Sequence, residues 1–165
     1  MLYPAMNYRV NLQQVNWTSL IKTELTGKKA PRWLQKTDIL FLARGNNNYA
    51  TYLDEVNEQT LCSPHFFQIH VKDENIILPE YLAWQINQKP VQNYLCSVGE
   101  GTVVRNIRRA VLESIPITVP TIKDQLLTIK VSKIENQLHE FFVQQIENNQ
   151  SIMAGIAQQQ VTKNI

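Results

Sequence analysis

Apolar and polar positions along the last third of the chain recur at the spacing of one long amphipathic helix. Thr121 can serve as its N-cap, and Asp124 three residues later approximates a capping box. After Pro120 the chain has no further proline, and Gly155 is the only glycine. The pattern therefore predicts a continuous helix over residues 121–160, and a rise of about 1.5 Å per residue makes it ~60 Å long.

The apolar side chains of this segment step by four and three residues, which is the a/d spacing of a coiled coil. A preceding body of ~120 residues has a radius of gyration of only ~14 Å, so the helix extends beyond it and needs a partner for its apolar stripe. We expect an antiparallel homodimer. The alternative is a break near residues 147–150, where the seam turns polar, with two helices folded back on each other. The seam consists of Leu127, Val131, Ile134, Leu138 and Phe141.

Shorter patterns in the preceding part of the chain predict strands. Residues 37–45 are an apolar run of strand length that ends in a glycine. Residues 61–71 are typical of a strand or a bulged strand pair, with Pro64 at an edge or turn. Residues 46–53 open with three asparagines, which disfavour helix and strand, so we expect a loop there. Residues 115–120 predict a short strand with its prolines at the ends.

Two further segments have helical patterns. Residues 78–88 place a proline and a glutamate in a first turn, where both are favoured, and residues 90–96 follow as a second helix. The first thirty residues are polar and rich in glutamine and asparagine, and they predict no particular element. Together these patterns indicate an α+β fold. A small mixed globular domain over residues 1–120 precedes one long coiled-coil-type helix over residues 121–165.

The distribution of charge along the chain is informative about function, whereas the net charge is not. The chain of 165 residues has a formal net charge of only +2 at pH 7. Residues 22–49 carry six basic and two acidic side chains, and residues 101–112 carry three arginines and no acid. Residues 50–100 between them carry seven acidic and two basic side chains. If the fold brings the two basic islands together, they form one positive face suited to a polyanion; the alternative is two unrelated solvated patches.

Both basic islands also contain asparagine, which gives them chemistry suited to DNA. Arginine matches guanine and asparagine matches adenine, whereas arginine and lysine also bind phosphates without reading sequence. The alternatives are a plain turn for the asparagine run and a solvated helix face for the arginine cluster. We expect one concave positive surface. Its base-reading residues would be Arg44, Asn46, Asn47, Asn48 and Tyr49, and phosphates would contact Lys28, Lys29 and Arg32 with part of the cluster Arg105, Asn106, Arg108 and Arg109.

Signatures of catalysis and metal binding are missing from the sequence. His65, His70 and His139 are scattered, and no serine or cysteine is paired with a histidine at an interpretable spacing. We therefore expect a protein without catalytic activity, metal or cofactor. Cys62 and Cys96 are isolated, which favours separate buried thiols over a disulfide. No apolar run approaches a membrane span and no signal peptide is apparent, so we expect the cytoplasm and no membrane contact.

Several short motifs occur in a fixed order along roughly residues 34–146. They are a strand of the type Gly-Asp-Ile-Leu, a Pro-x-x-Leu helix, a glycine, a hydrophobic strand ending in Ile-x-x-Pro, and a glutamine before a long helix. The matching positions are Asp38, Ile39 and Leu40; Pro79, Tyr81 and Leu82; Gly101 and Ile107; and Leu112, Ile115, Pro120 and Gln125. In this order they resemble the specificity subunit of type I restriction-modification systems. Thr37 departs from the pattern, because a glycine is usual there.

The resemblance implies a reader of double-stranded DNA. Full-length members of the family carry two target-recognition domains and two long helices, so this chain, with one of each, resembles a half-subunit. In the family, each recognition domain grips half of a split site, while the long helices pack antiparallel as a spacer and dock the methyltransferase (M) subunits. The resemblance therefore implies a subunit that directs methyltransferase and restriction (R) subunits to their site and leaves catalysis to them.

Two other functions remain open at this point. A truncated interaction protein would dock or block other subunits through its helix without reading DNA, and a poor basic face in the folded chain would favour it. A standalone enzyme would require a convergent acidic or histidine-containing pocket. The positions of the basic islands in the fold therefore discriminate between the first function and its nearest alternative.

Overall fold

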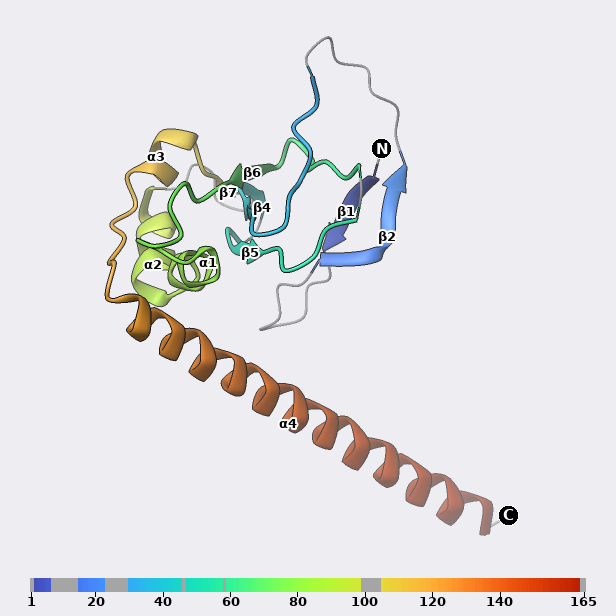
Figure 1. Cartoon of the computed structure of the whole chain (residues 1–165). Helices are drawn as coiled ribbons and strands as arrows, with labels where there is room; N and C mark the ends of the chain where they lie inside the picture. The colour runs from blue at the N-terminus through green and yellow to red at the C-terminus, as the bar shows by residue number, and fades with distance from the viewer. Residues whose placement is uncertain are drawn as a thin grey trace. The chain divides into compact units, whose positions relative to one another are not determined.

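The fold is α+β, as predicted, with short antiparallel strands and three short helices before one long C-terminal helix (Figure 1). The chain divides into two compact units, Met1–Ile129 and Lys130–Ile165. The first two turns of the long helix belong to the first unit. The computed structural model describes residues 2–6, 15–22, 30–45, 47–57, 59–98 and 105–163.

A three-stranded antiparallel sheet forms the centre of the first unit. Strand β3 (Ile39–Leu42) lies between β5 (Ala50–Tyr52) and β6 (Phe66–Ile69). All four side chains of β3 are buried, as the apolar run predicted. The expected loop over residues 46–53 is wrong at β5, because Ala50, Thr51 and Tyr52 pair with β3, and only one residue separates them from the asparagines.

Two smaller strand pairs complete the described β-structure. Strands β1 (Leu2–Met6) and β2 (Val15–Lys22) form an antiparallel hairpin in the part of the chain for which the sequence predicted no element. Strands β4 (Arg44–Gly45) and β7 (Arg105–Asn106) form a second, very short antiparallel pair. This second pair joins segments that lie about sixty residues apart in the sequence.

The two predicted helices of the first unit are confirmed. Helix α1 (Pro79–Ile86) begins with a proline, and helix α2 (Lys89–Val98) follows after a short turn. A third helix, α3 (Arg109–Glu113), follows β7. The strand predicted over residues 115–120 is wrong: these residues join no described sheet, since two of the six are prolines that offer no N–H to a ladder.

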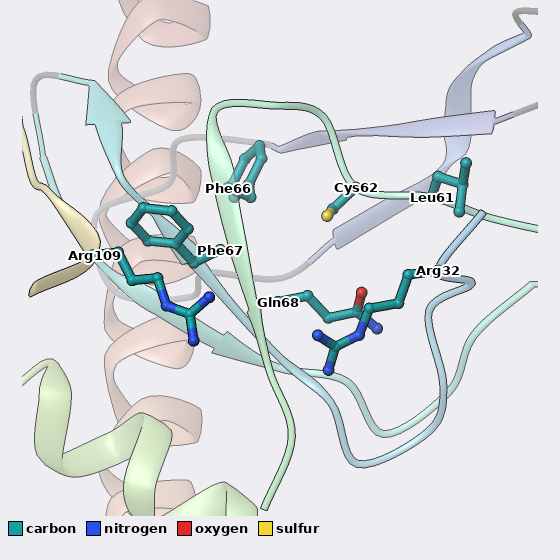
Figure 2. A pocket seen from close by; sticks show the side chains of 7 residues that line it. All are labelled: Arg32, Leu61, Cys62, Phe66, Phe67, Gln68 and Arg109. Carbon is teal, nitrogen blue, oxygen red and sulfur yellow. The ribbon is translucent and has the colours of Figure 1, made fainter. Parts of the chain in front are cut away.

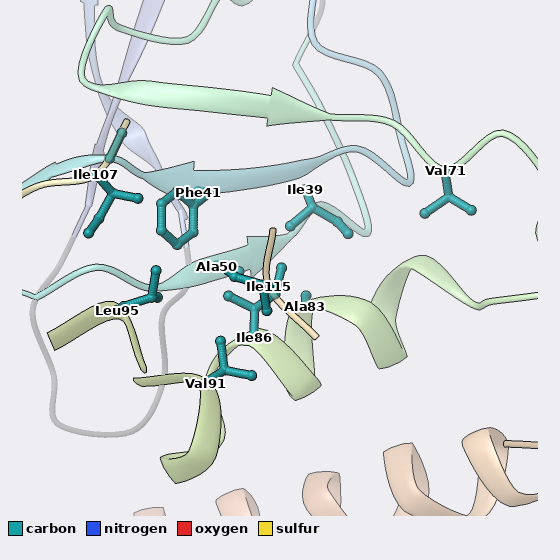
Figure 3. Packing of buried hydrophobic residues seen from close by; sticks show 11 residues of the cluster. Ile39, Phe41, Ala50, Val71, Ala83, Ile86, Val91, Leu95, Ile107 and Ile115 are labelled. Carbon is teal, nitrogen blue, oxygen red and sulfur yellow. The ribbon is translucent and has the colours of Figure 1, made fainter. Parts of the chain in front are cut away.

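The main hydrophobic core lies between one face of the sheet and helices α1 and α2 (Figure 3). Side chains alternate along a strand, so Ile39 and Phe41 face this core, whereas Leu40 faces a smaller cluster on the other side of β3. Ile86 on α1 and Leu95 on α2 pack opposite the sheet. The core thus fixes the positions from which the strand ends and the following loops project.

Gln125 fastens the start of the long helix to the rest of the first unit. Its side chain is fully buried, although it is polar. Its Oε1 accepts a hydrogen bond from the backbone N–H of Leu78 at 2.8 Å, and its Nε2 donates to the carbonyl oxygens of Ile76 (3.0 Å) and Pro120 (2.9 Å). Since Leu78 is the N-cap residue of α1, this one amide connects the first turns of two helices.

The turn before β3 has an unusual backbone at Thr37. Its φ of 72° lies in the left-handed region, which glycine occupies without strain and β-branched residues avoid. The N–H of Thr37 donates to the carbonyl of Leu53 at 2.9 Å, so the surrounding structure holds this conformation. The turn therefore keeps the shape that a glycine would favour, at the position where the family pattern has glycine.

Replacing Thr37 by glycine should stabilise the protein by about 0.5–1 kcal/mol. A left-handed conformation costs a non-glycine residue roughly 1–2 kcal/mol, which the substitution removes. Glycine also has more freedom in the unfolded chain, and this offsets about 0.5–1 kcal/mol of the gain. Urea unfolding measures the change. Thr37→Ala is the control and should gain less, because alanine keeps a Cβ atom. A glycine variant less stable than the wild type would contradict the turn described here.

The long helix α4 (Ile122–Lys163) has 42 residues and is continuous, which confirms the prediction and excludes the break expected as an alternative near residues 147–150. Its start has half of the predicted capping box: the N–H of Asp124 donates to Oγ1 of Thr121 at 3.3 Å, and that hydroxyl donates to the Asp124 carboxylate at 2.6 Å. The first bond satisfies one of the N–H groups that a helix start leaves without an intrahelical partner; the second joins the two side chains.

The apolar seam of α4 is exposed to solvent in the single chain. The relative exposure of its five residues lies between 48 % and 60 %. Within the described residues of the second unit, no side chain is fully buried. No helix of the described chain is both long and apolar enough to span a bilayer. The seam residues are Leu127, Val131, Ile134, Leu138 and Phe141.

Candidate nucleic-acid interface

The pairing of β4 with β7 brings the two basic islands of the sequence together. Arg44 lies opposite Asn106, and Gly45 lies opposite Arg105. The N–H of Ile107 also donates to the carbonyl of Ala43 at 2.8 Å, which extends the pairing by one residue. The side chains of Arg44 and Asn106 are exposed. An arginine and an amide from distant parts of the chain therefore occupy neighbouring positions on one short ribbon.

Gly45 is required by the close packing of this ribbon. A Cβ atom at this position would lie 2.8 Å from Cδ2 and 3.3 Å from Cγ of Leu42, whose side chain is 5 % exposed. Real side chains essentially never come that close, so any other residue would push Leu42. The glycine thus leaves room for the buried side chain of Leu42 beside β4.

The asparagine run after β4 divides between surface and interior. Asn47 is exposed, but Asn48 is only 1 % exposed and its Nδ2 donates to the carbonyls of Leu42 (2.9 Å) and Ala43 (3.2 Å). Tyr49 is 6 % exposed. The side chain of Asn48 therefore holds the loop to β3 instead of facing solvent, and neither Asn48 nor Tyr49 is exposed enough to contact a base edge.

Three other candidates lie outside the described residues, namely Lys28, Lys29 and Asn46. For Arg105 only the backbone is described. Arg108 is exposed and is the N-cap residue of α3. The candidates with described, exposed side chains are Arg32, Arg44, Asn47, Asn106, Arg108 and Arg109.

An open pocket of about 350 Å³ lies along β6, at one end of the strand order β5–β3–β6 (Figure 2). It contains two of the candidate arginines, Arg32 and Arg109, which are far apart in the sequence. Figure 2 shows Arg32 on the same side of β6 as Gln68, and Arg109 on the other side with Phe67. No local pattern in the sequence indicates this pocket. Its lining residues are Arg32, Leu61, Cys62, Phe66, Phe67, Gln68 and Arg109.

The pocket lining holds two arginines and no acid, and the acid that pairs with one of them in the described part of the chain is weakly held. Nε of Arg109 lies 2.7 Å from Oε1 of Glu113, one helical turn away. Both side chains are largely exposed, at 79 % and 60 %, and such surface pairs contribute only ~0.2–1 kcal/mol. Arg109 can therefore exchange Glu113 for a phosphate at little cost.

The side chain of Gln68 is held in the pocket by a buried carboxylate. Nε2 of Gln68 donates to Oδ2 of Asp38 at 2.6 Å and to the carbonyl of Trp33 at 3.1 Å. Asp38 is 1 % exposed, and its carboxylate also accepts from the N–H of Gln35 at 2.8 Å. Nδ1 of His70 lies 3.1 Å from Oδ1 of the same carboxylate. Asp38 thus orients two side chains of the neighbouring strand segment.

Cys62 lies on the same pocket as a half-buried thiol. Burial raises its pKa above the ordinary value of a thiol, and the nearby Arg32 opposes this shift only in part. Because the thiolate is the reactive form, Cys62 is a weak nucleophile. Among the described residues, no group of three or more His, Cys, Asp or Glu side chains could hold a metal ion.

Comparison with known proteins agrees with the motif order found in the sequence. The family model described as the type I restriction modification DNA specificity domain matches residues 5–159 of the chain. No match is found among the curated proteins. The matched segment includes both basic islands, the pocket along β6 and nearly all of α4.

Proposed function

The chain belongs to the family of type I restriction-modification DNA specificity domains, and from this premise we propose that it is a half-subunit that recognises one half of a split DNA site. Methyltransferase and restriction subunits would be directed to that site and would supply all catalysis. The family match supports the DNA specificity role itself. The split site, the partner subunits and the contact residues are our proposal.

The single observation that carries the DNA contact is the juxtaposition of the basic islands. Arg44 in β4 lies opposite Asn106 in β7, and Arg32 shares a pocket with Arg109. Each pair joins one residue from each island, although a net acidic stretch separates the islands in the sequence. A positive surface made in this way suits the phosphates of DNA, and its arginine and asparagine side chains suit base edges. A poor basic face would have favoured the truncated interaction protein.

We propose that two copies associate through their long helices in an antiparallel homodimer. The exposed seam of α4 supports this, because a stripe of large apolar side chains at a/d spacing is stabilised by a facing helix. Antiparallel pairing makes the assembly two-fold symmetric. The two recognition domains would then read an inverted, interrupted sequence, with the helices of 42 residues as the spacer.

The proposal is tested on the complex assembled with its methyltransferase subunits, by mapping which DNA sites become methylated. Arg44→Ala should relax specificity at one position of the site, at a cost of about 1–3 kcal/mol, if Arg44 contacts a base. If Arg108 contacts a phosphate, Arg108→Ala should weaken binding to all DNA sequences and should reduce the salt dependence of binding by about one counterion. The matched control is Lys130→Ala, which removes an exposed basic side chain from the second unit.

Two results would overturn parts of this proposal in different ways. If both arginine variants methylate the same sites as the wild type, at the same rate and salt dependence, the basic islands are not the DNA-binding face. If the assembled wild-type complex shows no sequence preference at all, the chain acts as an interaction protein that docks other subunits through α4.

A further inference from the structure

The amide of Gln68 has a fixed orientation, because its nitrogen faces two acceptors. Nε2 lies 2.6 Å from Oδ2 of Asp38 and 3.1 Å from the carbonyl oxygen of Trp33. An amide oxygen in that place would face two other oxygens, which is unfavourable. Both N–H groups of the side chain are thereby used. The atom that remains for a ligand is Oε1, which is purely an acceptor.

This arrangement excludes the usual contact between glutamine and adenine. That contact is bidentate and needs the amide nitrogen to donate to adenine N7 while the oxygen accepts from N6. In Gln68 the nitrogen is committed to Asp38, whose carboxylate is buried and accepts it at a short distance. The side chain of Gln68 therefore has only a hydrogen-bond acceptor left for a ligand, and the ligand must supply the donor.

The rest of the pocket is suited to the edge of a base pair. Gln68 lies on β6, at one end of the three-strand order, and lines an open pocket. Arg32, on the same side of the strand, adds donors only, and Phe66 adds an apolar surface (Figure 2). In the major groove the donors are the exocyclic amino groups, N4 of cytosine and N6 of adenine, and acceptors lie next to them.

We infer that Gln68 is a specificity-determining residue, whose Oε1 accepts a hydrogen bond from an exocyclic amino group in the major groove. It selects cytosine or adenine at one position and disfavours thymine and guanine, whose O4 and O6 are acceptors that repel another acceptor. Asp38 acts as the positioning residue that holds the amide in this orientation. This inference rests on the proposed DNA-reading function and names a further contact within it.

The test uses the assembled complex and its own recognised sequence, measured as binding affinity. Single cytosines are replaced by 2-pyrimidinone and single adenines by purine, which removes only the amino group. At one position of the half-site, removal should weaken wild-type binding about five- to thirtyfold. The two analogues distinguish cytosine from adenine as the source of the amino group.

Gln68→Met should abolish the part of this dependence that comes from the hydrogen bond to Gln68, so that only the general effect of the analogue on the duplex remains. Comparing the two proteins on both DNAs also cancels any general weakening of the duplex by the analogue. Gln88→Met is the matched control, because Gln88 is also partly buried and donates its Nε2 to a backbone carbonyl, that of Trp84, outside the pocket. This control should retain the full dependence.

A second measurement needs no change at Gln68 and so remains valid if that variant does not fold. Cys62 lines the same pocket, so DNA that carries a thiol tether on the amino group in question, as a mixed disulfide, should cross-link to it. The Cys62 thiolate attacks the mixed disulfide and releases the small thiol; because burial raises the pKa of Cys62, the reaction is run at alkaline pH, where this thiolate forms. Cys62→Ser should lose the cross-link, although Cys96 is still present.

The outcomes separate the inference from the function on which it rests. A complex that reads sequence but tolerates removal of every amino group in the half-site would overturn the role of Gln68. The role of Gln68 would also be overturned if removal of the amino group weakened binding equally in the wild type and in Gln68→Met. It would be overturned as well if the tether on that amino group did not cross-link to Cys62. A complex without any sequence preference would instead overturn the proposed function itself.

Discussion

Replacing Gln125 by alanine lowers the free energy of unfolding by about 3 kcal/mol, because three backbone groups lose their hydrogen bonds at once. The amide contacts Leu78, Ile76 and Pro120, and its side chain is fully buried. Each typical hydrogen bond contributes ~1 kcal/mol, and a buried group left without a partner costs ~1–3 kcal/mol. Urea denaturation followed by circular dichroism measures the loss.

Two variants test the physical reason for this loss. Gln125→Glu keeps an acceptor for Leu78 but sets carboxylate oxygens against two carbonyls, so it should be strongly destabilising near neutral pH. Gln137→Ala removes an exposed glutamine from the same helix and should change stability by less than about 0.5 kcal/mol. A Gln125→Ala variant as stable as the Gln137→Ala control would show that these hydrogen bonds do not fasten α4.

Replacing both Ile134 and Leu138 by aspartate should dissociate the proposed dimer into monomers. Both positions lie in the exposed seam of α4, at 48 % and 52 % exposure in the single chain. Burying unpaired carboxylates in a helix interface is strongly unfavourable, so the dimer dissociation constant should rise at least ~1000-fold, or about 4 kcal/mol. Light scattering at micromolar concentration measures the mass directly.

The control for this experiment adds the same charges on the face of α4 opposite the seam. Asn136→Asp with Gln150→Asp places two aspartates at f positions of the heptad, neither of them next to a seam residue, and the net charge changes by the same amount. This variant should remain dimeric. A wild-type protein whose mass equals one chain at micromolar concentration would contradict self-association through the seam.

Local patterns in the sequence predicted the elements that are stabilised locally. The apolar run of β3, the proline-led helix α1 and the threonine N-cap of α4 are each encoded within a few residues, and each is confirmed. Strand β5 was missed because its three residues follow directly on an asparagine-rich stretch and acquire their structure from pairing with β3.

The candidate site depends on contacts that no local pattern records. The sequence showed that the basic islands are similar in composition, but only the pairing of β4 with β7 makes Arg44 a neighbour of Asn106. The bond between Gln68 and Asp38 spans thirty positions. The sequence also could not distinguish exposed Asn47 from buried Asn48, because both are asparagines in one turn and their difference lies in which carbonyls the chain brings near.

The packing at Gly45 has a consequence for how such a protein diverges. A side chain at this position would displace the buried side chain of Leu42, so substitutions of Gly45 disturb the interior. If the residues around it contact DNA as we propose, a new target is acquired by varying those residues instead. Arg44, Asn47 and Asn106 are exposed, so mutations at these positions are not constrained by the core. Evolution of new sequence preference should therefore concentrate its accepted changes at the sites flanking this glycine, with the glycine itself retained.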